Sequence, residues 1–413
     1  MMSLQIKPIL VALRRHKAGT VLIALQIALT LAIVCNALFI IHQRLAKLSE
    51  PSGVDETDVF VIHNRWAADI STQQVDAQVR ADLLALRQLP GVRDAAAASG
   101  YPLQGAGWDK FITMTPDQVK PTTDSAVYTG DERLLDTLGL RLTAGRNFRP
   151  DEILMSGNQQ EVIPPVVIVS KALADRLFPD GSALGKSFYA MSATPSTIIG
   201  IVDNLHRQGT SQSDTTYAGQ SLIWPLRPDD PFGLDYIVRA QPGQLAAAMR
   251  EAPSALFAQS RMRMIDPRDG IQDYAEIRHR AYASDRGMAI LMGIVSVVLL
   301  AITGAGIVGL TSFWVGQRRR QIGIRRALGA TRGDILAYFL TENLLIGLGG
   351  VALGAVLAIV INLWMMMRFE MVRMSLTYVA IGVVVLLLLG QGAVLAPARR
   401  ASRVSPVEAT RSL

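Results

Sequence analysis

Residues 315–331 read VGQRRRQIGIRRALGAT, a short basic segment between two long apolar stretches. Six arginines lie in it or directly after it, namely Arg318, Arg319, Arg320, Arg325, Arg326 and Arg332. Moving such a cluster across a bilayer is costly, and basic residues beside membrane spans stay preferentially in the cytosol. We therefore predict that this segment is a cytosolic loop, and this prediction orients the rest of the chain.

Four apolar segments are long enough to cross a bilayer, which takes about 20 residues in a helix. We predict spans over residues 19–41, 288–315, 335–366 and 375–396. Basic residues precede the first span, as in a secretory signal. Its apolar run is longer than the about 7–15 residues of a signal core, so we expect an anchor that is not cleaved.

The distribution of charge agrees with this topology. The three predicted cytosolic pieces, 1–18, 316–334 and 397–413, hold 14 Lys and Arg but only two acidic residues. The predicted external region, 42–287, holds 25 basic and 30 acidic residues. The excess of basic residues behind the net charge of +7 therefore lies in the segments beside the membrane. A nucleic-acid-binding protein would carry a basic face on one domain, so we expect no nucleic-acid partner.

The external region is long enough to bury its own core. Apolar spacing predicts a helix over 75–89, ended by Pro90 and Gly91, and a second helix over 170–177. Residues 166–169 and 197–202 are rich in β-branched residues and are predicted strands. The expected fold class is an α-helical membrane protein with four transmembrane helices, one and then three. A large α+β extracytoplasmic domain of two lobes is expected between the first and second helices.

No motif for catalysis or cofactor binding is found in the sequence. Residues 181–187 read GSALGKS, with three residues between the glycines, whereas a phosphate loop needs four. The five histidines are scattered without metal-ligand spacing, and Cys35 is the single cysteine. We expect no catalytic residue, no metal and no cofactor on this chain.

Two features of the spans leave alternatives open. Glu342 is an acidic residue at a predicted membrane entry, where a carboxylate is by default a functional candidate. A structural role is the favoured interpretation, in which Glu342 reaches toward the membrane surface or pairs with a loop arginine. Gly350 and Gly354 form a GxxxG pair that permits close helix contact. Packing among the last three spans of the same chain is favoured over a dimer contact.

Nearly the whole chain resembles the MacB/FtsX-like family of ABC transporter permeases. The strongest likeness is the segment 318–331, followed by the FLTE of residues 339–342. A second is the tail, which reads PARRASRVSPVEA over 397–409. Further motifs in 139–148, 168–179, 184–186 and 199–203 resemble the periplasmic core domain of the family. Gln321 departs from the pattern, because the family usually carries Glu there.

The resemblance implies a permease subunit that couples ATP hydrolysis on a separate ABC ATPase to movements of the periplasmic domain by mechanotransmission. ATP and Mg would bind to the ATPase. The implied ATPase-coupling residues are Arg318, Arg319, Arg320, Gln321, Ile322, Gly323, Ile324, Arg325, Arg326, Ala327, Leu328, Gly329, Ala330 and Thr331. Further expected partners are a second permease chain, equal or related, a periplasmic adaptor, an outer-membrane channel and membrane lipid.

The expected function is tripartite export from the bacterial inner membrane. A lipoprotein-extracting or hydrolase-regulating permease of the same family is an alternative, and a membrane-anchored sensor is an alternative from another class. The expected organisation is a cytosolic amphipathic segment over 1–18, a first span over 19–41, a periplasmic domain over 42–287, a second span over 288–315, a cytosolic coupling loop over 316–334, a third span over 335–366, an external loop over 367–374, a fourth span over 375–396 and a cytosolic tail over 397–413.

Overall fold

The computed structural model describes residues 17–67, 70–155, 162–210, 217–369 and 372–403. The chain divides into two compact units. The membrane unit comprises residues up to Ser49 and from Ser284 onward, and the external unit runs from Glu50 to Ala283. The predicted amphipathic segment at the N-terminus, the middle of the loop over 367–374 and the end of the tail lie outside the described residues.

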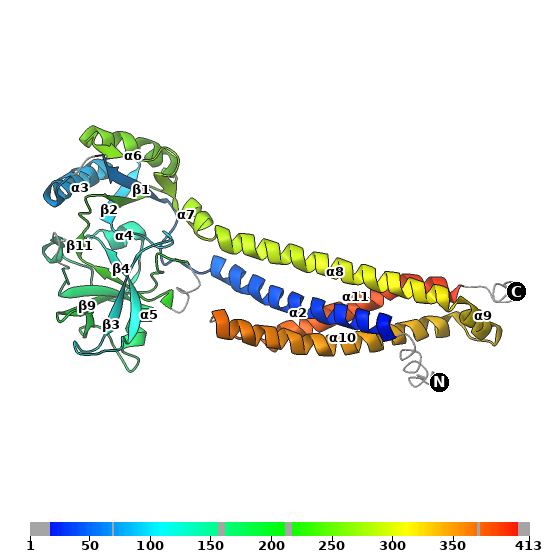
Figure 1. Ribbon diagram of the computed structural model, residues 1–413. Helices are drawn as coiled ribbons and strands as arrows, with labels where there is room; N and C mark the ends of the chain where they lie inside the picture. The colour runs from blue at the N-terminus through cyan, green and yellow to red at the C-terminus, as the bar shows by residue number, and fades with distance from the viewer. Residues whose placement is uncertain (1–16, 68–69, 156–161, 211–216, 370–371, 404–413) are drawn as a thin grey trace. The chain divides into compact units, whose positions relative to one another are not determined.

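Among the described residues, four helices are long and apolar enough to cross a membrane. They are α2 (Lys17–Leu48), α8 (Ala283–Gln317), α10 (Arg332–Phe369) and α11 (Leu376–Ser402). A short helix, α9 (Arg319–Ala327), connects α8 to α10 (Figure 1). All four long helices extend beyond the predicted spans at one end or both, because a helix continues past the apolar residues that set the predicted limits.

The glycines of the GxxxG pair lie against α2, the first span. A Cβ atom on Gly354 would come 2.8 Å from the backbone oxygen of Ala28, and one on Gly350 would come 2.9 Å from that of Ala24. Only glycine permits such an approach of two helix backbones. The contact is within the chain, as favoured, but the expectation that it joins two of the last three spans was wrong.

Polar side chains connect α2 to the helices around it. The Asn36 side chain donates to the carbonyl oxygen of Ala358 in α10 at 3.2 Å. The hydroxyls of Thr30 and Thr303, in α2 and α8, lie 2.7 Å apart. Near the external ends of the same two helices, Arg44 forms an ion pair with Asp285. Because buried polar groups in a membrane need partners, these bonds fix the register of α2 against its neighbours.

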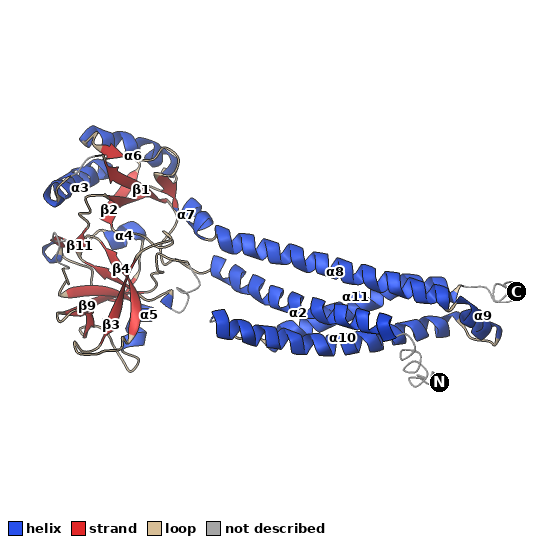
Figure 2. Ribbon diagram, in the orientation of Figure 1, coloured by secondary structure: helices blue, strands red, loops and turns tan. Residues whose placement is uncertain are grey.

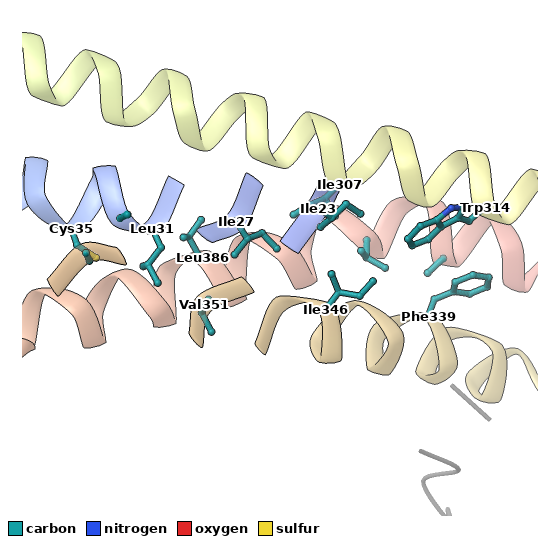
Figure 3. Close-up of a cluster of buried hydrophobic side chains, with 14 of the residues drawn as sticks. Ile23, Ile27, Leu31, Cys35, Ile307, Trp314, Phe339, Ile346, Val351 and Leu386 are labelled. Atoms are coloured by element: carbon teal, nitrogen blue, oxygen red, sulfur yellow. The ribbon is translucent and has the colours of Figure 1, made fainter. Parts of the chain in front are cut away.

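The buried apolar core of the membrane unit runs along the inner faces of these helices. Ile23, Ile27 and Leu31 of α2 lie between residues of α8, α10 and α11, including Ile307, Ile346 and Leu386 (Figure 3). Toward α9 the core includes Trp314 and Phe339.

In the external unit, the described strands form two larger sheets and one small pair (Figure 2). The first sheet has five strands in the order β13-β1-β12-β2, with β14 also paired to β1. Their bounds are β1 (Val59–Trp66), β2 (Val92–Ala98), β12 (Gly233–Ala240), β13 (Arg263–Met264) and β14 (Ile271–Asp273).

Two helices, α3 (Thr72–Arg87) and α6 (Leu245–Gln259), cover one face of this sheet. Helix α3 begins at a capping box, in which Ser71 and Gln74 satisfy each other's backbone N–H groups. This explains why it starts before the predicted residue 75. Val61 and Ile237, which point away from the helices, are also fully buried, so the sheet is covered on both faces.

The second sheet has seven strands in the order β5-β9-β7-β10-β4-β3-β8, and β8 also pairs with β9. The additional pairing closes six of these strands into a ring. The bounds are β3 (Trp108–Thr113), β4 (Thr123–Thr129), β5 (Leu142–Gly145), β7 (Val166–Ser170), β8 (Ser187–Ala190), β9 (Pro195–Val202) and β10 (Ser221–Trp224).

The remaining elements of the external unit are short. They are α4 (Leu134–Leu138), η1 (Pro150–Glu152), α5 (Lys171–Leu177), α7 (Tyr274–Ala281) and the strand pair β6 (Leu154–Met155) and β11 (Leu226–Arg227). The two sheets, each with its own helices, confirm the predicted fold class: four apolar helices and an α+β external domain of two lobes.

Candidate functional site

Helix α9 occupies the segment in which the sequence placed the coupling loop. It starts directly after α8 and ends at a sharp turn before α10. Gly329 has a φ of +101°, a conformation that side-chain-bearing residues rarely adopt, and the N–H of Ala330 donates to the carbonyl of Arg325 at 3.0 Å. This is a left-handed helix cap, which reverses the chain direction within a few residues. Thr331 and Asp334 then cap the start of α10.

The inner face of α9 is built into the membrane unit. Ile322 is 4% exposed and belongs to the same apolar core as Trp314, Phe339 and Ala398. Gly323 is buried beside it. Because α9 is amphipathic and its apolar side is covered by α8, α10 and α11, it is a packed helix with a definite orientation.

Arg318, Arg325 and Arg326 contact other residues of the chain. Nη1 of Arg318 lies 3.0 Å from both carboxylate oxygens of Glu342, and the two side chains are 11% and 3% exposed. Glu342 therefore pairs with a loop arginine, which is one form of the structural role that the sequence favoured. The Arg325 guanidinium lies 5.0 Å from the centre of the Tyr338 ring. Arg326 donates to the carbonyl oxygen of Ser402 at the end of α11, at 3.2 Å. These contacts hold α9 on α10 and α11.

The outer face of α9 is defined by Arg320, Ile324 and Leu328, which are four residues apart and so lie on one side of the helix. All three are exposed, and Leu328 is 84% exposed. A cationic side chain beside two uncovered aliphatic side chains is typical of a protein-binding surface. Gln321, the position that departs from the family pattern, is exposed next to this face.

Among the fourteen predicted coupling residues, the structure thus distinguishes two groups. Arg318, Ile322, Gly323 and Arg326 face the chain's own helices, whereas Arg320, Ile324 and Leu328 are available to a partner. The sequence pattern did not distinguish these groups. Four-residue spacing joins Arg320, Ile324 and Leu328 on one side of the helix, but it also joins Arg318, Ile322 and Arg326, so it does not show which side is covered. That the outer face contacts an ATPase remains a prediction.

Removing the charge of Glu342 tests the structural role of its pair. We expect Glu342→Gln to lower the stability of the membrane unit by about 1–3 kcal/mol, since a charged hydrogen bond is lost and Arg318 stays mostly buried. Resistance to denaturing detergent measures this. Arg320→Gln removes an exposed cation from the same region and is the matched control. Equal stability of both variants would contradict the assignment.

The GSALGKS segment and the side chains that could bind a metal are the other candidates for chemistry in this chain. The GSALGKS segment runs into strand β8, whereas a phosphate loop opens a helix, and the Lys186 ammonium lies over the Phe178 ring at 4.7 Å. Among the described residues, no group of three or more His, Cys, Asp or Glu side chains is arranged to hold a metal ion.

Four apolar helices around a buried core, an external α+β domain and a basic connecting helix define a multi-pass membrane protein of the permease class. The chain belongs to the family of proteins with a MacB-like periplasmic core domain, whose model matches residues 20–255. The model for the FtsX-like permease C-terminal region matches residues 293–406. The chain is therefore a MacB/FtsX-type ABC transporter permease.

Relatives with similar sequences carry names of the same family. The macrolide export ATP-binding/permease protein MacB of Chromobacterium violaceum is 29% identical over 340 residues, which cover 77% of this chain and 49% of that protein. The chain spans about half the length of the first curated relatives it matches. The uncharacterized ABC transporter permease YvrN of Bacillus subtilis is 28% identical over 301 residues, 69% of each chain.

Solved structures also match part of this chain. The match with the extracellular domain of the transporter YknZ from Gram-positive bacteria covers 51% of this chain and 98% of the solved chain, with 18% identity and a TM-score of 0.32. The match with the periplasmic region of MacB from Actinobacillus actinomycetemcomitans covers 57% of this chain and 97% of the solved chain, with 15% identity and a TM-score of 0.32.

Proposed function

We propose that this chain is the membrane subunit of an ABC transporter in which a separate ATPase docks on the outer face of α9. The observation that carries the proposal is the division of α9 into a packed inner face and an exposed outer face. A rigid helix can transmit the movement of a docked partner, since its inner side is locked by Ile322 and by the bonds of Arg318 and Arg326. ATP and Mg bind to the ATPase in this proposal.

The transmitted movement would pass along α8. This helix has 35 residues, roughly 50 Å at 1.5 Å per residue, and connects α9 to the external unit without interruption. Two contacts at different heights join α8 to α2. One is between the hydroxyls of Thr30 and Thr303, and the other is the ion pair between Arg44 and Asp285. We propose that α2 and α8 move together and carry nucleotide-driven motion to the external domain.

The orientation in this proposal follows the basic residues. The N-terminus, α9 and the tail lie in the cytosol of a bacterial inner membrane, and the external unit lies in the periplasm. A second permease chain completes the transporter. Export through a periplasmic adaptor and an outer-membrane channel is the proposed output, supported by relatives that are named macrolide export proteins. The extraction of a lipoprotein and the regulation of a hydrolase are the alternative outputs within the family.

Purification from native membranes in mild detergent tests the partners. We expect an ABC ATPase to co-elute with this chain in a fixed ratio and to hydrolyse ATP. An accompanying adaptor supports export, whereas an ATPase with only a second, related permease supports lipoprotein extraction or regulation. Elution of the chain without any ATPase contradicts the proposal and favours a sensor.

A further inference from the structure

The external unit contains a cleft of about 830 Å³ that the proposed function does not use. It is lined by residues of strands β1 and β12 from the five-stranded sheet and of β3, β4 and β10 from the seven-stranded sheet. Pockets that bind small organic molecules are typically about 300–1,000 Å³ and lie where two structural layers meet. The cleft has both properties.

Two aromatic side chains of the cleft are exposed to solvent. Trp108 is 73% exposed, and Phe232 is 82% exposed. They come from segments more than 100 residues apart in the sequence, and both line this one cleft. Large aromatic surfaces favour contact with an apolar partner, since burial of each ring removes a large area from water.

Several charged groups of the cleft already have partners within the chain. Nδ1 of His63 lies 2.6 Å from Oδ1 of Asp235. Arg227 donates to Asp76, which lies outside the cleft, at 2.8 Å. Oδ1 of Asp230 accepts from the backbone N–H of Phe232 at 2.8 Å. An ionic ligand would compete with these contacts, so an uncharged ligand fits the cleft better.

The indole N–H of Trp224, like the side-chain Nδ2 of Asn64, differs from these groups, since neither has an acceptor among the described residues. Trp224 lines the cleft and is only 4% exposed. Within the part of the chain that the structure describes, its Nε1 has no hydrogen-bond partner. A buried indole N–H usually finds an acceptor, because an unsatisfied donor costs free energy. A ligand oxygen in the cleft would supply that acceptor.

We propose that this cleft binds an uncharged organic molecule with an aromatic or apolar body and at least one hydrogen-bond-accepting oxygen. The body lies against Trp108 and Phe232, and the oxygen accepts from Nε1 of Trp224. The ligand site belongs to the external unit alone. The proposal therefore goes beyond ATPase coupling and stands or fails independently of it.

The test uses the full-length chain in an amphipathic polymer without lipid or ATPase. The probe is prodan, an uncharged naphthalene ketone whose emission shifts to the blue and brightens in an apolar site. The dye is excited directly, so the signal does not depend on which tryptophans remain. We expect saturable binding, weakened about fivefold by Trp224→Phe, which removes the donor and keeps a ring. Trp108→Ala and Phe232→Ala should weaken it by about tenfold.

Phe111→Ala is the matched control, because Phe111 is an exposed aromatic residue on the same strand as Trp108 but does not line the cleft. Its affinity should equal that of the wild type. Phe232 is largely exposed, so its variant should fold even if a change at Trp224 impairs folding. Absence of saturable binding, or equal affinities of all variants, overturns the proposal.

Discussion

Arg320→Glu combined with Leu328→Asp should weaken the association of the ATPase strongly while leaving the permease inserted and folded. Both residues are exposed on the outer face of α9. The variant places two carboxylates where a cation and an uncovered apolar side chain stood. We expect the affinity for the ATPase to fall at least tenfold, about 1.4 kcal/mol or more, since central interface residues contribute most of the binding free energy.

Co-purification of the ATPase and its activity in the reconstituted complex measure this effect. Arg400→Glu is the control, because Arg400 is also exposed and basic but lies near the end of α11. It should retain the ATPase. Substitution of Arg325 and Arg326 gives a less direct test, since their contacts with Tyr338 and Ser402 hold α9 in place. Unchanged ATPase binding and activity in the outer-face variant would disprove the coupling assignment.

Asp82→Ala should destabilise the external unit by about 3–5 kcal/mol. Asp82 in α3 forms an ion pair with Arg263 of β13, and both side chains are 0% exposed. Two guanidinium nitrogens donate to the carboxylate, at 2.8 and 2.9 Å, and the Tyr236 hydroxyl also donates to it. Removal of the carboxylate leaves a buried guanidinium without its counter-charge, which is far more costly than loss of an exposed pair.

Denaturant unfolding, followed by tryptophan fluorescence, measures this loss. Trp66 is a suitable reporter, because the Arg263 guanidinium lies 5.6 Å from the centre of its ring. Asp175→Ala breaks an exposed pair with Lys171 and should cost less than about 1 kcal/mol. The double variant Asp82→Leu with Arg263→Met should recover most of the stability, since it leaves no unpaired charge. If Asp82→Ala and Asp175→Ala have equal effects, the pair has no special role.

The sequence predicted features that depend on local composition. The apolar segments identified α2, α8, α10 and α11, and the β-branched runs identified β7 and β9. The Arg-rich motif between two spans identified the connecting segment that forms α9. Each of these signals lies within a single stretch of the chain, so no knowledge of distant contacts was needed.

Contacts between segments that are far apart in the chain could not be predicted from the sequence. The GxxxG motif indicated a close helix contact, but its partner was one of several apolar helices with similar composition. The structure places Gly350 and Gly354 of α10 against α2. The cleft was not predicted either, because Trp108, Trp224 and Phe232 come from segments that meet only when the two lobes assemble.

The sequence alone predicts four membrane helices, an α+β external domain and a basic connecting segment, because the length of an apolar span and the hydrophobic periodicity of helices and strands are each contained in one stretch of the chain. Only the tertiary structure decided which arginines are available to a partner. Arg320 and Arg326 belong to the same nine-residue helix, but Arg326 is bonded to the end of α11 and Arg320 is exposed. The physical reason is that at about 3.6 residues per turn they point to different sides of α9, and the packing of α10 and α11 covers only one of those sides.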